Sequence, residues 1–122
     1  MGWRILLVDD DPLLREALAD AFSAEGHAVH EAEHGGRALE LLASGVRPGI
    51  ILLDIVMPVM NGFDFLERKN ADPDLAAIPV VVISATERRL PPGAVAMVAK
   101  PFEPSELHEL IARHHAPLEP TV

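Results

Sequence analysis

Short apolar runs alternate with amphipathic stretches along the whole chain. Four runs are bounded by turn residues or by a polar side chain, which is typical of strands buried on both faces of a parallel sheet. These runs cover Ile5–Val8, Ile50–Leu53, Val80–Ile83 and Ala94–Ala99. A fifth segment, His27–Ala32, is less apolar and is predicted to be a strand nearer the edge of the sheet.

Between these strands the apolar residues recur at helical spacing. Asp11 and Pro12 predict a helix start, because an acid is favoured at the N-cap and proline at the first helical position. Gly26 predicts the end of that helix. Further helices are expected from Gly35 to about Gly45, from about Phe63 to Asn70, and from about Pro104. The first helix is expected to turn one face to the core, formed by Leu14, Ala17, Leu18, Ala21 and Phe22.

Strands that alternate with helices predict a doubly wound α/β fold with right-handed crossovers. Five strands in this rhythm suit the flavodoxin-like order 2-1-3-4-5, in which the first and third strands are neighbours. The 122 residues are enough to bury roughly two-thirds of the unfolded surface in one core. We therefore expect one domain over residues 1–116 and a flexible C-terminal tail over residues 117–122.

The apolar runs end in polar side chains. The first run ends in Asp9 and Asp10, and the central run ends in Asp54. The last two runs end in Ser84 and Lys100. Because ligands bind outside the carboxyl ends of the strands in open α/β sheets, we expect these side chains to gather in one site. An acid at a strand end can also cap the next helix, but polar residues at four strand ends favour a site.

Three ionised carboxylates at such an edge repel one another, by on the order of 4 kcal/mol for a pair about 4 Å apart at an effective dielectric near 20. Lys100 contributes one positive charge. Oxygen ligands of this kind suit Mg²⁺, whose two charges would bring the sum to zero. A carboxylate beside such an ion can attack phosphorus and form an aspartyl phosphate. A simple salt bridge between Lys100 and the acids is the alternative.

The composition argues against several other classes of function. A net charge of −9 argues against direct nucleic-acid binding, which needs a basic face. No stretch reaches the roughly 20 apolar residues that span a bilayer, and no signal peptide precedes Trp3, so no membrane partner is expected. The chain has no cysteine, which excludes disulfides and thiolate metal sites and fits a cytoplasmic location.

The motifs at these positions resemble those of CheY-like receiver domains of two-component response regulators, over nearly the whole chain. They read ILLVDDDP at the first strand, LLDIVMPVMNG around Asp54, VVISAT at the fourth strand and VAKPF at the fifth. The resemblance implies that Asp54 is the phosphoacceptor. It also implies that Asp9, Asp10 and the backbone carbonyl of Val56 join Asp54 in holding Mg²⁺.

The resemblance assigns roles to the other strand-end residues as well. Ser84 matches the hydroxyl residue that switches with phosphorylation, and Lys100 matches the lysine that contacts the phosphoryl group. The peptide bond between Lys100 and Pro101 is expected to be cis, as in the family. Met97 occupies the position of the family's aromatic switch residue, and methionine is apolar and adaptable enough to fill the same space.

The resemblance implies a signalling protein and not an enzyme, one that catalyses only its own phosphorylation and dephosphorylation. The phosphoryl group would come from a sensor histidine kinase or a phosphotransfer protein. Output would pass through contacts with a downstream target protein or through a homodimer. Two alternatives are a pseudo-receiver scaffold that is never phosphorylated and a receiver excised from a longer response regulator. A phosphatase of the haloacid-dehalogenase type is disfavoured, because Val56 stands where that family has a second acid.

One segment departs from the family pattern. Sixteen positions separate Ser84 from Lys100, and the family fits a full helix into this stretch. Here Pro91, Pro92 and Gly93 interrupt it and prevent a helix from continuing. The helix that the family places fourth is therefore expected to be shortened or absent.

Overall fold

The computed structural model describes residues 2–55, 60–86 and 89–116, which contain five strands and four helices. The strands are β1 (Arg4–Val8), β2 (Ala28–Ala32), β3 (Ile50–Asp54), β4 (Val80–Ser84) and β5 (Ala96–Ala99). The helices are α1 (Pro12–Ala24), α2 (Gly35–Ala43), α3 (Gly62–Ala71) and α4 (Pro104–His114). Within these ranges no helix is long and apolar enough to be a candidate for crossing a bilayer.

The five strands form one parallel sheet in the order β2-β1-β3-β4-β5, which confirms the flavodoxin-like fold. Val8 of β1 pairs with Leu53 of β3, so the residues that follow them leave the sheet side by side. Asp54 pairs with Ile83 of β4, and Ser84 comes one position later. The register therefore brings the polar ends of three strands to one edge.

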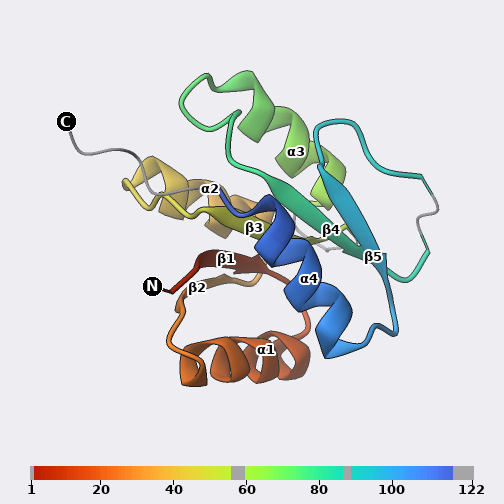
Figure 1. The fold of residues 1–122 in the computed structure, drawn as a ribbon. Coiled ribbons are helices and arrows are strands. Elements are labelled where there is room, and N and C mark those ends of the chain that lie inside the picture. Colours follow the sequence, from red (N-terminus) through yellow and green to blue (C-terminus); the bar gives the residue numbers. More distant parts are fainter. Residues whose placement is uncertain (1, 56–59, 87–88, 117–122) are drawn as a thin grey trace.

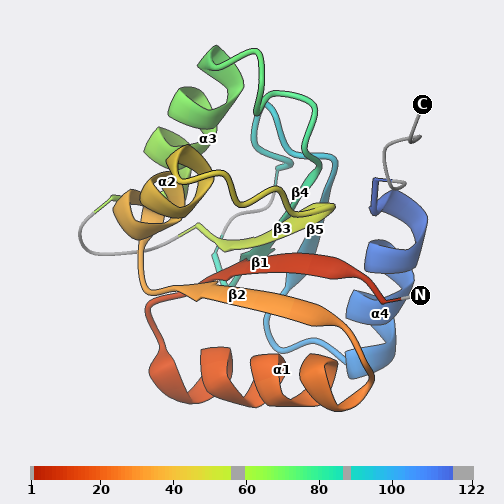
Figure 2. The same ribbon diagram turned by 90° about the vertical axis from the view of Figure 1, so that its left-hand side faces the viewer.

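Helices cover both faces of the sheet, with α2 and α3 on one side and α1 and α4 on the other (Figures 1 and 2). On the first face Leu42 and Phe65 join the buried core, and on the second Phe22, Leu107 and Ile111 do so. β3 and β4 are buried at every position. Each large apolar side chain buried in this way contributes about 1.5–3 kcal/mol, so the core holds the strand ends firmly in register.

The predicted caps of α1 are present, but its predicted inward face is partly wrong. The side chain of Asp11 accepts hydrogen bonds at the helix start, and Gly26 has the left-handed φ of 90° that glycine permits. Phe22 and Ala19 are buried. Ala17 and Ala21, predicted to face the core, are exposed, as Ala24 is. The large Phe22 ring fixes the rotation of the helix about its axis, because its burial contributes much more free energy than the burial of an alanine.

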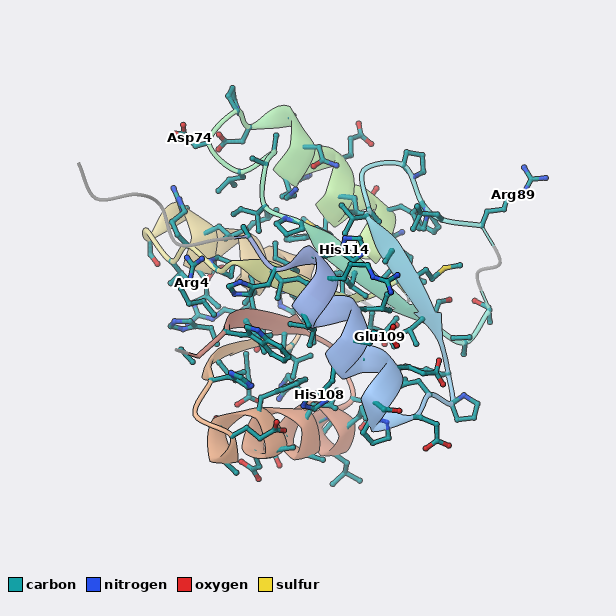
Figure 3. The ribbon with its side chains drawn as sticks, viewed as in Figure 1. Arg4, Asp74, Arg89, His108, Glu109 and His114 are labelled. Carbon is teal, nitrogen blue, oxygen red and sulfur yellow. The ribbon has the colours of Figure 1, made fainter. Side chains whose placement is uncertain are left out.

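In the residues described between β4 and β5, which are 85–86 and 89–95, no position is helical. This confirms that the family's fourth helix is shortened or absent. The connection runs as bends and turns, and Arg89 points away from the sheet (Figure 3). β5 begins at Ala96 and not at Ala94, because Ala94 is still part of a turn that its N–H closes onto the carbonyl of Pro91.

Candidate functional site

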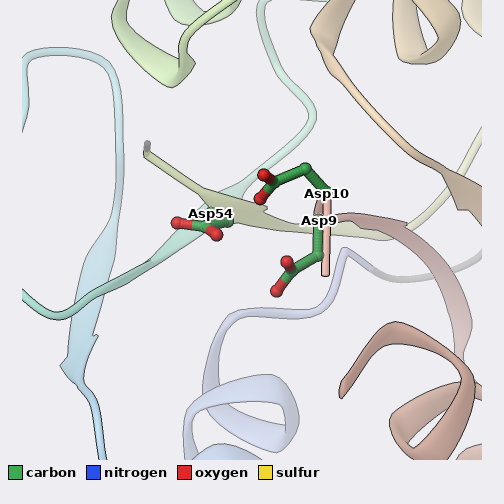
Figure 4. Close-up of side chains that lie close together, drawn as sticks. All are labelled: Asp9, Asp10 and Asp54. Atoms are coloured by element: carbon green, nitrogen blue, oxygen red, sulfur yellow. The ribbon is translucent and has the colours of Figure 1, made fainter. Parts of the chain in front are cut away.

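Asp9, Asp10 and Asp54 lie together at the carboxyl edge of the sheet (Figure 4). Each offers one carboxylate oxygen, and these oxygens lie within 4.8 Å of one another. Asp9 and Asp54 are buried, and Asp10 is exposed. The three acids meet because β1 and β3 are hydrogen-bonded neighbours that end at the same level.

Asp9 lies in an unfavourable environment for a charged carboxylate. Its Oδ1 accepts a hydrogen bond from the N–H of Asp11 at 2.9 Å, while its Oδ2 is buried with no hydrogen-bond partner in the described parts of the chain. Burial raises the pKa of Asp9 to about 6, and the Asp54 and Asp10 carboxylates add to the rise; the Asp11 N–H and Lys100 oppose it. A buried oxygen without a partner is costly, and a bound cation would remove that cost.

Lys100 follows β5 and brings a positive charge to these acids. Its Nζ lies 3.4 Å from Oδ2 of Asp54 and 3.9 Å from Oδ2 of Asp9. The backbone N–H of Lys100 donates to the carbonyl of Ser84 at 2.8 Å, and the peptide bond to Pro101 is cis, as predicted. The lysine side chain keeps 26% of its surface exposed, so the ammonium group pairs with the acids and is still within reach of a ligand.

Ser84 and Met97 are placed by β4 and β5. Ser84 is buried at the end of β4, and its Oγ accepts a hydrogen bond from the N–H of Thr86 at 3.1 Å. Met97 is half-buried and packs against the core on the face covered by α2 and α3. Val56, the expected carbonyl ligand, lies outside the described residues. The edge of the sheet therefore carries acids, a lysine and a hydroxyl from four strands.

Arg15 supports the site and was not predicted from the sequence. Its guanidinium donates to the backbone carbonyl of Asp9 at 2.8 Å, and its Nε lies 3.3 Å from Oε1 of Glu31. Arg15 thereby ties α1 to the end of β1 and to β2. A positive charge is unfavourable near a helix N-terminus. The presence of an arginine in the first turns of α1 therefore indicated in the sequence that its guanidinium binds a specific acceptor group in the fold.

The start of α3 is held directly against the residue that follows Asp54. The N–H of Gly62 donates to the carbonyl of Ile55 at 2.8 Å. A Cβ atom on Gly62 would lie 2.7 Å from the Cα of Ile55 and 3.2 Å from the carbonyl oxygen of Asp54. Only glycine permits this approach, so the position of Asp54 and the position of α3 depend on each other.

The arrangement has the components of a phosphoryl-transfer site. Three carboxylates within 4.8 Å form an oxygen-only ligand set of the kind that suits Mg²⁺. Oδ2 of Asp9 is buried without a hydrogen bond from the described residues and has only the distant Lys100 ammonium group at 3.9 Å, which is an independent indication that this point accommodates a cation. A carboxylate nucleophile beside a divalent cation and a lysine can take up a phosphoryl group, because phosphoryl transfer depends on positioning and on neutralised oxygens.

Comparisons with known sequences point to one family. The family model for the response regulator receiver domain matches residues 5–112. The response regulator MprA of Mycolicibacterium vanbaalenii is 38% identical over 127 aligned residues, which cover 99% of this chain and 52% of MprA. Protein PilH of Pseudomonas aeruginosa is 38% identical over 85 residues, which cover 70% of this chain and 69% of PilH. The chain thus spans about half the length of MprA.

Solved structures of receiver domains share the fold. The receiver domain of a sensor histidine kinase from Pseudomonas aeruginosa superimposes with a TM-score of 0.84 at 26% identity, covering 93% of this chain and 98% of that one. That structure holds a magnesium ion in its active-site cleft. The response regulator TrrA of Thermotoga maritima, solved in complex with Mg²⁺ and BeF, gives a TM-score of 0.79 at 29% identity over 93% of this chain and 98% of TrrA.

Proposed function

Because this chain belongs to the response regulator receiver domain family of two-component signalling, we propose that Asp54 accepts a phosphoryl group in a Mg²⁺-dependent reaction. The observation that carries the proposal is the meeting of Asp54 with Asp9, Asp10 and Lys100 at one edge of the sheet. This set combines a nucleophile, ligands for a cation and a positive charge for the phosphoryl oxygens. A pseudo-receiver that is never phosphorylated would have no use for all three.

Asp54 is the nucleophile in this proposal. One of its carboxylate oxygens forms the new O–P bond while the N–P bond of a phosphohistidine donor breaks, and the bonding electron pair stays on the imidazole nitrogen. Lys100, whose Nζ is 3.4 Å from Oδ2 of Asp54, is within reach of one phosphoryl oxygen. Ser84 brings a hydroxyl to the same edge for another oxygen and so links the phosphoryl group to the connection that follows β4.

Asp9 and Asp10 are the proposed cation ligands together with Asp54. Bound there, Mg²⁺ would neutralise the carboxylates and the incoming phosphoryl oxygens. Burial of Asp9 and its hydrogen bond from Asp11 fix the carboxylate in one orientation, whereas the exposed Asp10 can bind directly or through water. The carbonyl of Val56 is proposed as a further ligand on the basis of the family motif.

A phosphodonor protein has to approach the Asp54 edge, and an apolar groove beside Lys100 suits that approach. The groove has a volume of about 540 Å³ and is lined by Leu14, Leu18, Lys100, Pro101, Phe102 and Pro104. Lys100 belongs both to this groove and to the acidic site. We propose that the sensor histidine kinase or phosphotransfer protein docks here. Because such a donor is charged from ATP, we propose that the exchange occurs in the cytoplasm and that a downstream protein reads the result.

The decisive experiment is phosphorylation by acetyl phosphate in the presence of Mg²⁺, followed by mass-spectrometric mapping. The wild-type chain is expected to take up one phosphoryl group on Asp54, and Asp54→Asn is expected to take up none. Asp64→Asn, an exposed acid in the first turn of α3, is the control and should label as the wild type does. Equal labelling of the Asp54→Asn variant would overturn the assignment, and a wild type that never labels would indicate a pseudo-receiver.

A further inference from the structure

α3 presents a stripe of its surface to a groove beside the β4–β5 connection. The stripe follows the i, i+3, i+4, i+7, i+8 spacing of one helix face. It consists of the exposed Phe63, Glu67 and Ala71, the half-buried Asn70 and, beneath them, the buried Leu66. Pro92 and Gly93 line the same groove, which has a volume of about 450 Å³. A side chain on Gly93 would overlap the Asn70 amide, so the connection rests directly on α3 at this point.

No helix in the described ranges covers this groove. The connection is not helical over residues 85–86 and 89–95, and large apolar side chains of α3 and of this connection stay in solvent. Phe63 of α3 is 43% exposed, Leu90 is 49% exposed and Val95 is 43% exposed. Apolar side chains that are exposed on adjoining segments mark a site of interaction with another molecule.

The shape and the charge of the groove identify the kind of partner. A regular ridge at helical spacing packs against another helix, as in helix-in-groove recognition. Glu67 gives the lining a negative charge, and the lining residues within the described parts of the chain include no lysine or arginine. The chain carries a net charge of −9, so a second copy would add repulsion. We propose that this groove binds an amphipathic helix of a partner protein whose apolar face is flanked by lysine or arginine.

The groove is connected to the phosphoryl-acceptor edge through both of its walls. On the α3 side, Gly62 donates its N–H to the carbonyl of Ile55, directly after Asp54. On the other side, the connection leaves β4 at Ser84, whose Oγ accepts the N–H of Thr86. A phosphoryl group on Asp54 that engages Ser84 would shift one wall relative to the other. This second part of the inference, that phosphorylation changes helix binding, rests on the proposed function.

Two synthetic helical peptides with the same leucine positions test the groove, one carrying lysine and the other glutamate at the remaining positions. Binding is followed by the amide resonances of ¹⁵N-labelled protein. The lysine peptide is expected to shift residues 62–71 and 89–95 saturably, and the glutamate peptide is not. Phe63→Gln and Glu67→Lys should each weaken binding about tenfold. Leu13→Gln, which removes an apolar side chain that is 79% exposed on α1, should leave the affinity unchanged.

Several outcomes would overturn the inference. Equal binding of the glutamate peptide would refute the charge argument, and shifts confined to the groove beside Lys100 would refute the location. Self-association in sedimentation equilibrium that Phe63→Gln abolishes would show that the occupant is a second copy of the chain.

The coupling to phosphorylation has a separate readout. In protein shown by mass spectrometry to be phosphorylated, the affinity for the lysine peptide should change at least about fivefold relative to the unphosphorylated wild type. Treatment of Asp54→Asn with acetyl phosphate should cause no such change. An unchanged affinity in phosphorylated protein would refute the coupling alone. If no phosphorylation occurs, the proposed function fails, while the basal affinity still tests the groove.

Discussion

Nζ of Lys100 lies 3.4 Å from Oδ2 of Asp54, although β4 separates the strands that carry the two residues. The same ammonium group lies 3.9 Å from Oδ2 of Asp9 on the far side of β3. One positive charge therefore serves acids from two strands. At an effective dielectric near 20, an attraction at about 4 Å is on the order of 4 kcal/mol before desolvation is subtracted, which explains how the acids stay together in the metal-free chain.

Substitution of Lys100 by methionine should separate metal binding from phosphoryl transfer. Lys100→Met removes the cation but keeps an apolar stem of similar length, so the three acids are left with a larger net negative charge. We expect Mg²⁺ to bind at least as tightly as in the wild type, as measured by calorimetric titration. We expect phosphorylation by acetyl phosphate to slow about a hundredfold, because a preorganised charge facing the phosphoryl oxygens is lost.

The matched control is Arg113→Gln, which removes an exposed cation on α4 that pairs with Glu109. It should change neither the Mg²⁺ affinity nor the rate. A Lys100→Met variant that is phosphorylated at the wild-type rate would show that the ammonium group has no role in the transfer.

Removal of Asp10 should weaken the effect of Mg²⁺ on stability without harming the metal-free fold. Asp10 is exposed and lies beside two other acids, so metal-free Asp10→Ala should be at least as stable as the metal-free wild type. Mg²⁺ at about 100 times its Kd stabilises the wild type by about 2.7 kcal/mol, and a tenfold loss of affinity would lower that gain by about 1.4 kcal/mol. Thermal unfolding with and without Mg²⁺ measures both quantities.

Asp20→Ala provides the control, because it removes an exposed acid from α1 and leaves the cluster intact. It should keep the full stabilisation by Mg²⁺. If Asp10→Ala keeps it as well, Asp10 is not part of the cation site.

The strand order and the shared edge could be predicted because the signals for them are local. Four of the five strands contain an apolar run, each helix has a cap or a glycine near its end, and alternation of strands and helices permits few topologies. The loss of the helix between β4 and β5 could be predicted equally well from Pro91 and Pro92, since proline prevents a helix from continuing. The meeting of Asp9 with Asp54 then follows from the parallel register alone.

Other features depend on tertiary contacts that no local pattern encodes. Ala19 and not Ala17 faces the core, because alanine is indifferent to burial and the fit of Phe22 decides the rotation of α1. Lys69 is 1% exposed, although any hydropathy pattern assigns a lysine to solvent. The carbonyl of Ala76 accepts a hydrogen bond from the Lys69 ammonium group. Ala76 lies seven positions later in the sequence, and its carbonyl reaches Lys69 only when the loop after α3 folds back.

Gly62 should tolerate a side chain far less well than a glycine elsewhere in a first helical turn. In Gly62→Ala the new Cβ would meet Ile55 backbone at 2.7 Å, which forces α3 away from the residue after Asp54. We expect a loss of more than about 1 kcal/mol in unfolding free energy and slower phosphorylation. Urea unfolding and acetyl phosphate labelling measure the two effects.

Gly36→Ala is the comparison, because its Cβ would meet only the His34 ring, at 3.0 Å. Alanine is favoured over glycine in a helix by up to about 1 kcal/mol, so this variant should be unchanged or more stable. Equal destabilisation by the two substitutions would show that the contact with Ile55 is not the cause.

The buried ammonium group of Lys69 should make the protein more stable at alkaline pH. Nζ donates to Oδ1 of Asn70 at 2.9 Å and to the carbonyl of Ala76 at 3.0 Å. Burial nevertheless lowers the pKa of Lys69 from 10.5 to about 8. Between about pH 8 and pH 10.5 the unfolded chain therefore holds a proton that the folded chain has released, and stability rises with pH across this window.

Below about pH 8 both states carry the proton, and the cost of burying the charge, on the order of 3 kcal/mol, is fully present. Lys69→Met removes this cost together with its pH dependence. We measure the unfolding free energy of both proteins in urea at pH 7 and at pH 10. Between these pH values the wild type should gain about 2–3 kcal/mol of stability relative to Lys69→Met. The chain has no tyrosine or cysteine, and all other groups are common to both proteins, so their contributions cancel. A difference that stays constant between the two pH values would mean that Lys69 titrates in the folded protein as it does in the unfolded chain.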